Sequence, residues 1–321
     1  MITLVVIAPI LTEIISGNTP PHALLRPSVS LFLIAAYSLP LLVIRELAVR
    51  RRLGIAGLLS LGLAYGILNE GLLAQTLLRA QGVPVRNFDH YLYAGGVNYS
   101  WAFVIVPWHA LLAVVLPLTL LAWWYPACSQ VTWLGRRTFA ILGAFVLASV
   151  VFLVLVRKPH AQMRSFLVVM AVLVVASLIL PRGRQTQIRK EGRGAAAFAF
   201  GIVLYLAFFL GPILLAAIHI PPVWYFFLIV AVFAAFGWLG RRLEFDVLPS
   251  AAIAALGVYF AASVFNLLGG VGHHSLEEVI CGGLLSVVFL ILPKVSPRGV
   301  AKAAGRSGLQ NARTQTPART S

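Results

Sequence analysis

Residues 139–156 read FAILGAFVLASVVFLVLV, a run of 18 residues without a charged side chain. An α-helix needs about 20 apolar residues to cross the hydrocarbon core of a bilayer. The run lacks the alternation of polar and apolar residues that a membrane-spanning β-strand shows. It therefore predicts a transmembrane α-helix, and similar runs cover most of the chain.

The composition of the whole chain indicates that its solvent is lipid. The 321 residues are 60% hydrophobic and 11% charged, whereas soluble domains carry roughly 25% charged residues. The net charge of +16 would suggest a nucleic-acid partner in a soluble protein. Here the bias of Lys and Arg toward cytoplasmic loops explains it, and we expect membrane lipids, not nucleic acid, as partners. Cys128 and Cys281 have neither metal-binding nor redox spacing, so we expect no structural disulfide.

Ten hydrophobic segments follow one another, near 1–16, 28–47, 54–79, 100–124, 138–156, 165–181, 195–219, 222–239, 250–269 and 276–293. With both termini in the cytoplasm, 19 Lys and Arg residues fall on the cytoplasmic side and 6 on the other. The loop 157–164 breaks this pattern, and the short first segment is either tilted or re-entrant. The sequence thus predicts an all-α polytopic transmembrane bundle in the cell (inner or plasma) membrane. It divides into a transmembrane domain, 1–293, and a basic, disordered cytoplasmic tail, 294–321.

Glu70 is the acidic residue that stands out at membrane depth. It follows Gly62 and Gly66 at spacings of four residues in GLAYGILNEG, residues 62–71, so the three share one helical stripe. Small residues on a stripe allow close helix contact, so we expect Glu70 to point into the bundle. It is either a catalytic, metal-binding or proton-carrying carboxylate, or a carboxyl group that joins helices.

Histidines supply the other candidates. His109 lies between Pro107 and Pro117 in the fourth segment and is either a general base or metal ligand, or a residue bonded to a carbonyl that a proline frees. His273 and His274 precede Glu277 and Glu278 at helical i, i+4 spacing, although Ser275 and Glu278 also fit a capping box.

These groups share one side of the membrane under the charge-derived topology. Glu13, Glu70, His109, His273, His274 and Glu277 fall in its outer half or just beyond, whereas residues 138–240 carry almost no polar residue at membrane depth. Their position favours a site open to the outside. The catalytic candidates are Glu70, His109 and His274, and zinc is a possible cofactor held among Glu70, His109, His273, His274 and Glu277.

Two family resemblances follow from these motifs. Glu13–Pro21, Arg45-Glu46-Leu47 and Leu63–Gln75 resemble an uncharacterised family of bacterial multi-pass membrane proteins, over about the first 125 residues, which implies no known activity. The chain also resembles the CPBP family of CAAX-processing and bacteriocin-processing intramembrane proteases. That family carries Glu-Glu-x-x-x-Arg, Phe-x-x-x-His and His-x-x-x-Asn/Asp motifs.

Parts of the three CPBP motifs occur here in the same order. Glu70 remains, with Asn69 and Ala74 in place of the other Glu and the Arg; His109 follows Ile105 instead of Phe; and His274 precedes Glu278. The resemblance implies an intramembrane hydrolase. The alternatives are a proton- or cation-coupled small-molecule transporter of five plus five helices, and a non-enzymatic membrane subunit.

Overall fold

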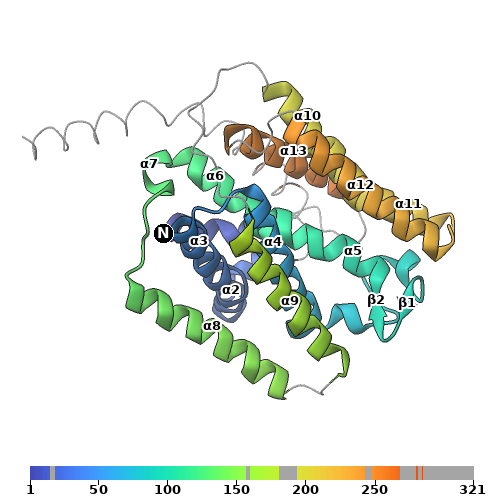
Figure 1. The fold of residues 1–321 in the computed structure, drawn as a ribbon, viewed down its shortest axis with the longest axis horizontal. Helices are drawn as coiled ribbons and strands as arrows, with labels where there is room; N and C mark the ends of the chain where they lie inside the picture. Colours follow the sequence, from blue (N-terminus) through green and yellow to red (C-terminus); the bar gives the residue numbers. More distant parts are fainter. Residues whose placement is uncertain are drawn as a thin grey trace, which may run out of the picture.

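The computed structural model describes residues 1–14, 19–156, 160–180, 194–242 and 248–267, together with Ile280 and Leu284. These residues form a bundle of helices, with one two-residue antiparallel hairpin of β1 (Tyr93–Ala94) and β2 (Val97–Asn98) (Figure 1). The all-α multi-pass architecture predicted from the sequence is therefore confirmed.

The first 124 residues contain most of the interruptions in helix geometry. Their α-helices are α1 (Ile2–Pro9), α2 (Pro27–Leu33), α3 (Leu39–Arg51), α4 (Ile55–Ile67), α5 (Tyr99–Trp108) and α6 (Leu116–Trp124). Wider π-helical turns continue four of them: η1 (Ile10–Ile14), η3 (Ile34–Ser38), η4 (Leu68–Leu73) and η7 (His109–Val115). Short 3-10 helices lie in the loops: η2 (Pro21–Leu25), η5 (Thr76–Leu78) and η6 (Arg86–Phe88).

The described residues after 124 contain fewer interruptions in helix geometry. They comprise α7 (Pro126–Ser129), α8 (Arg136–Val156), α9 (Gln162–Ile179), α10 (Gly194–Tyr205), the π-turn η8 (Leu206–Leu210), α11 (Gly211–Ala217), α12 (Pro222–Arg242) and α13 (Leu248–Leu267). In Figure 1, α8 runs along one edge of the molecule and α10 to α12 along the opposite edge, with α4 and α5 between them.

Seven helices in the described part of the chain are long and apolar enough to cross a membrane, and two shorter apolar ones span Ile2–Glu13 and Ile253–Phe265. These nine match the first nine predicted segments. The tenth, 276–293, lies outside the described residues apart from Ile280 and Leu284, so the count of ten stays a prediction. The third segment ends earlier than predicted, because its helix stops at Leu73 and Gln75 takes a left-handed conformation with φ of 57°.

Glycines bring two pairs of helices into close contact. A Cβ atom on Gly62 would lie 2.7 Å from the Cα of Ala110, and one on Gly66 would lie 2.7 Å from the carbonyl oxygen of Val106. The close contact predicted for the Gly62–Gly66 stripe is therefore present, between α4 and the α5–η7 helix. Gly201 of α10 likewise lies against the carbonyl of Ala254 in α13.

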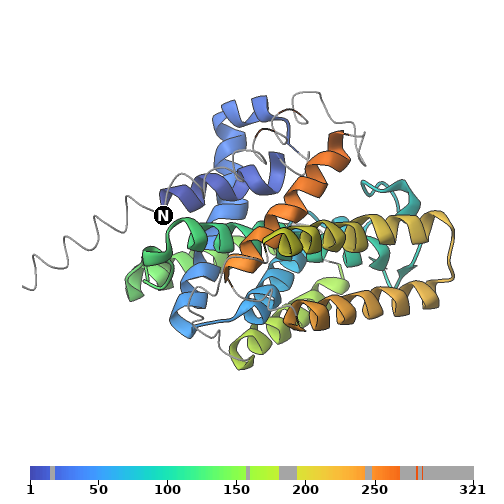
Figure 2. The same ribbon diagram turned by 90° about the horizontal axis from the view of Figure 1, so that it is seen from above.

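Different hydrogen bonds connect the loops at the two ends of the bundle. At the end that carries β1 and β2, the hairpin end, Gln162 donates to the carbonyl of Gly95 and the Tyr91 hydroxyl donates to that of Ile220 at 2.6 Å (Figure 2 gives a second view). Burial raises the pKa of Tyr91 above its ordinary value. At the other end, the arginine end, Arg50 donates to the carbonyl of Leu134.

Candidate functional site

Glu70 and His109 form a buried pair between η4 and η7. The Nε2 atom of His109 lies 2.7 Å from Oε1 of Glu70, and their side chains are only 4% and 12% exposed. The other carboxylate oxygen accepts from the Thr76 hydroxyl, which itself accepts from the indole N–H of Trp101 at 3.1 Å. Both oxygens of Glu70 are thus occupied, whereas Nδ1 of His109 is buried without a hydrogen-bond partner among the described residues.

The close approach of α4 and α5 explains why the two side chains meet. Gly62 and Gly66 set the backbones together, and Glu70 follows on the same stripe. Both Glu70 and His109 then lie in π-helical turns, η4 and η7, which widen the helix at the point of contact. Such turns are rare and occur frequently at functional sites.

Two tyrosines surround the imidazole of His109. The ring of Tyr37 stacks on it with centroids 6.2 Å apart and an angle of 22°, and the ring of Tyr65 meets it edge-on at 5.9 Å. The Tyr65 hydroxyl donates to the carbonyl of Ala36 and accepts from Asn69. These contacts fix the plane of the imidazole without using its free nitrogen.

Tyr37 connects this pair to a second buried carboxylate. Its hydroxyl donates to Oε1 of Glu13, whose other oxygen accepts from the Thr19 hydroxyl at 2.6 Å. Glu13 lies in η1 and Tyr37 in η3. Four of the five π-turns in the described residues therefore bring one side chain each to the same place: Glu13, Tyr37, Glu70 and His109.

The remaining predicted site residues lie outside the described residues, namely His273, His274, Glu277 and Glu278. Within the described ranges, no group of three His, Cys, Asp or Glu side chains is arranged to hold a metal ion. A zinc site that includes Glu70 and His109 would therefore need a further ligand from outside these ranges, where the predicted ligands His273, His274 and Glu277 lie.

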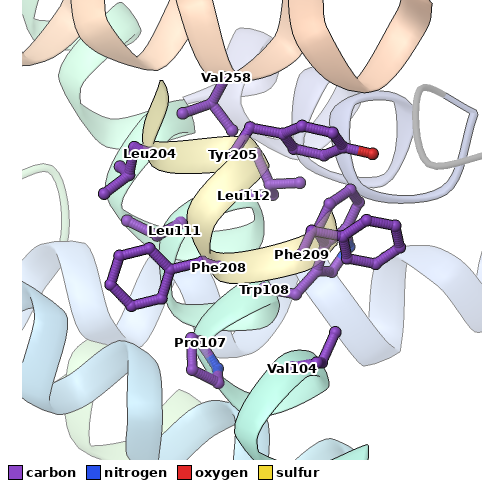
Figure 3. A pocket seen from close by; sticks show the side chains of 10 residues that line it. All are labelled: Val104, Pro107, Trp108, Leu111, Leu112, Leu204, Tyr205, Phe208, Phe209 and Val258. Carbon is purple, nitrogen blue, oxygen red and sulfur yellow. The ribbon is translucent and has the colours of Figure 1, made fainter. Parts of the chain in front are cut away.

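An apolar hollow lies beside the pair, on a neighbouring face of the α5–η7 helix (Figure 3). It separates this helix from α10, η8 and α13, and Trp108, the residue before His109, faces Phe209 across it with ring centroids 5.0 Å apart. Its lining is almost wholly apolar: Val104, Pro107, Trp108, Leu111, Leu112, Leu204, Tyr205, Phe208, Phe209 and Val258. Neither Glu70 nor His109 lines it, so it is separate from the polar pair.

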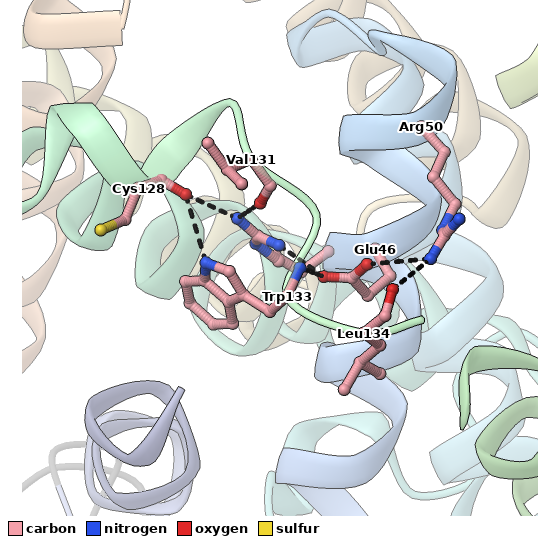
Figure 4. A network of polar contacts seen from close by, with 7 residues as sticks. Glu46, Arg50, Cys128, Val131, Trp133 and Leu134 are labelled. Carbon is pink, nitrogen blue, oxygen red and sulfur yellow. Dashed lines mark hydrogen bonds and ion pairs between the residues drawn. The ribbon is translucent and has the colours of Figure 1, made fainter. Parts of the chain in front are cut away.

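A second buried polar network lies at the arginine end (Figure 4). Arg45 pairs with Glu46 at 2.5 Å and donates to the carbonyls of Cys128 and Val131, while its guanidinium lies 3.7 Å from the ring centroid of Trp133. Glu46 also accepts from the Trp133 amide and from Arg50. This network fastens the α7–α8 connection to α3, and each of its buried charges has a partner.

A family model described as an uncharacterized membrane protein family matches residues 2–276. The chain belongs to that family. The match covers the Glu70–His109 pair, the Glu13–Tyr37 contact and the arginine network, so all three lie within the family domain. No curated protein and no solved structure matches the chain.

The sequence groups Glu13 with the polar residues in or just beyond the outer half of the membrane, but it does not identify Tyr37 or Thr76 as part of the site. The available signal was a tyrosine within the apolar segment 28–47, because a buried tyrosine hydroxyl needs a polar partner. Its partner was not predictable, because Glu13 is 24 residues away and both residues lie in π-turns.

Proposed function

We propose that the protein is a membrane-embedded hydrolase in which His109 acts as the general base and Glu70 orients it. The observation that supports this most strongly is the 2.7 Å contact between Glu70 and Nε2 of His109, with Nδ1 left without a partner. When Nε2 carries the proton toward Glu70, Nδ1 holds a lone pair that can accept one.

The chemistry follows from this division of roles. Nδ1 takes a proton from a water molecule as the water oxygen adds to a carbonyl carbon and the C=O π electrons move onto the carbonyl oxygen. The tetrahedral intermediate then expels the alcohol or amine, which takes the proton from Nδ1. The carboxylate of Glu70 stabilises the transient imidazolium. Glu70 itself is a poorer base here, because His109 and Thr76 already occupy its two oxygens. The pair is nearly closed to solvent, so turnover requires the segments that cover it to move. His274, outside the described residues, remains a candidate for orienting the water or stabilising the oxyanion.

The test is hydrolysis of long-chain acyl p-nitrophenyl esters and of membrane-inserted peptides by the purified protein in lipid nanodiscs. His109→Gln should lower the rate by about 10²–10⁴-fold, the usual contribution of a general base. Glu70→Gln should also lower it, because the amide cannot stabilise the imidazolium charge. His219→Gln, at an exposed position, is the matched control and should keep the wild-type rate. A wild-type rate in His109→Gln would exclude this mechanism.

The contact of His109 with Tyr37, which binds Glu13, favours a second candidate, a proton-coupled transporter. It would exchange protons between two carboxylates. In this case Glu13→Gln and Glu70→Gln should both abolish proton uptake by proteoliposomes containing a pH-sensitive dye.

The tight helix pairs give no support to a five-plus-five repeat, because they join the third and fourth segments in one half and the seventh and ninth in the other. A non-enzymatic subunit would show neither activity.

We further propose that the protein lies in the cell membrane with the arginine end in the cytoplasm, both termini on that side, and residues 294–321 as a basic tail. The excess of Lys and Arg supports this orientation. Reporter fusions in the loop before Arg136 and in the hairpin at Gly95 should report opposite sides, with the first in the cytoplasm. Fusions that report the reverse would contradict it.

A further inference from the structure

The arginine end carries a compact group of five arginines that the proposed hydrolase chemistry does not use. Arg50 and Arg51 end α3, Arg52 is the residue directly after it, and Arg136 and Arg137 begin α8. We propose that this group, the α3–α8 arginine cluster, binds the phosphate headgroup of an anionic phospholipid.

The structure brings the two runs of arginines together. Arg50 donates to the carbonyl of Leu134 at 2.6 Å, and its guanidinium lies 4.9 Å from the ring centroid of Phe139. These contacts straddle Arg136 and Arg137 and hold the start of α8 against the end of α3. Two sequence-distant pieces of chain thus contribute to one basic surface.

The charges of this cluster are available to a ligand. Arg51, Arg52, Arg136 and Arg137 are exposed, and none of them forms an ion pair with a described residue. Glu46, the acid that pairs with Arg50, has a fully buried side chain and already bonds Arg45, Arg50 and the Trp133 amide. Among the described residues, the cluster therefore presents positive charge that no acidic side chain compensates.

Its position points to lipid as the partner. Arg51 ends one apolar helix of membrane-spanning length, and Arg136 begins another. Groups of four to eight basic residues next to a membrane span attract anionic lipids. Arginine binds phosphate oxygens through two parallel N–H groups. The positive end of the α8 dipole adds to the same attraction.

A bound phosphate would also offset the unfavourable position of Arg136 and Arg137 in the first turn of α8. Basic residues in the first turn of a helix oppose its dipole, and here two of them stand beside three more at the end of α3. A bound phosphate would relieve both repulsions. The Arg45–Glu46 network holds the supporting loop whether or not lipid is bound, so the cluster is preformed.

The experiment titrates the purified full-length protein with phosphatidylglycerol, phosphatidylcholine or inorganic phosphate, and follows bound lipid by native mass spectrometry and the midpoint of thermal unfolding. The wild type should bind phosphatidylglycerol and unfold at a higher temperature, with little response to the other two. Arg136→Gln/Arg137→Gln should weaken phosphatidylglycerol binding by at least tenfold, since two basic residues are removed.

The matched control is Arg26→Gln/Arg86→Gln, which removes the same charge from exposed positions outside the cluster. It should bind phosphatidylglycerol as the wild type does. The proposal is overturned if both double variants weaken binding equally, if phosphatidylcholine binds as well as phosphatidylglycerol, or if inorganic phosphate reproduces the whole effect. None of these readouts depends on hydrolysis or proton uptake, so the lipid site and the proposed function can fail separately.

Discussion

The helices of residues 55–124 and those of residues 136–240 are all apolar enough to cross a membrane but lie in opposite environments, and Tyr99–Trp124 and Pro222–Gly240 have nearly equal mean hydropathies of 2.2 and 2.1. In the most apolar windows of the spans Ile55–Leu73 and Tyr99–Trp124, 72% and 94% of the residues are buried, against 6% for Arg136–Val156 and 11% for Pro222–Gly240. The spans of residues 55–124, the inner spans, hold the glycine contact and the Glu70–His109 pair, and residues 2–51 add Tyr37 and Glu13. The outer ones expose Val, Leu and Phe side chains such as Leu147, Phe152 and Phe227. Hydropathy alone does not separate a membrane helix that faces protein from one that faces lipid.

The largest expected effect concerns the pair itself. Glu70→Leu removes the carboxylate and leaves His109 with no partner for either ring nitrogen, so we expect a loss of about 3–5 kcal/mol in unfolding free energy. Denaturant unfolding in detergent measures it. Glu70→Gln is the control, because its amide can still accept from His109. A Leu variant as stable as the wild type would mean that the inner spans do not depend on the pair.

The glycine contact gives the next largest effect. Gly66→Ala places a methyl group 2.7 Å from the carbonyl oxygen of Val106, and such overpacking costs about 1–3 kcal/mol. Gly143→Ala is the matched change in the outer helix α8, where nothing lies within 4 Å of the added carbon; it should be neutral or slightly stabilising through helix propensity. Equal thermal shifts for the two variants would erase the distinction between inner and outer spans.

Tyr37→Phe tests the link to the second carboxylate. It removes the hydroxyl that donates to Glu13 and leaves a buried carboxylate oxygen short of a donor, at a cost of about 1–2 kcal/mol. Thermal unfolding of the variant measures this loss. Tyr93→Phe, whose exposed hydroxyl makes only a 3.4 Å contact with the carbonyl of Leu78, should have no measurable effect.

The smallest effect is expected at the contact between Tyr91, in the loop that joins α4 to α5, and Ile220, between α11 and α12. Tyr91→Phe removes the bond to the carbonyl of Ile220, at about 0.5–1 kcal/mol. Because the folded-state pKa of Tyr91 is raised, its contribution should be constant below pH of about 10, the unfolded value, and should decline as the pH rises through the folded value. Unfolding of both proteins between about pH 7 and 11 measures this: the difference in stability should shrink above about pH 10, and a difference that grows with pH would contradict the prediction.

The sequence supports some of these conclusions better than others. The spacing of residues along the chain was enough to predict that Glu70 lies on the same stripe as Gly62 and Gly66, because i, i+4 positions share a face in any regular helix. It was not enough for Tyr37 and Glu13, since π-turns shift the register on which that rule depends. The Arg45–Glu46 network was also not foreseen, because Arg45 bonds the backbone carbonyls of Cys128 and Val131, which no side-chain pattern encodes.

A π-turn holds one residue more than the α-helical turn it replaces, and this makes the centre sensitive to deletion as well as to substitution. Removing Leu68 from η4, between Gly66 and Glu70, would allow the helix to close into regular α geometry, with a rotation of about 100° between its two parts, the angle of one residue. His109 and Glu70 would both still be present in the protein, yet they would no longer face each other. Loss or gain of one codon within η1, η3, η4 or η7 thus offers evolution a way to switch this centre off and on without altering any of its chemical groups.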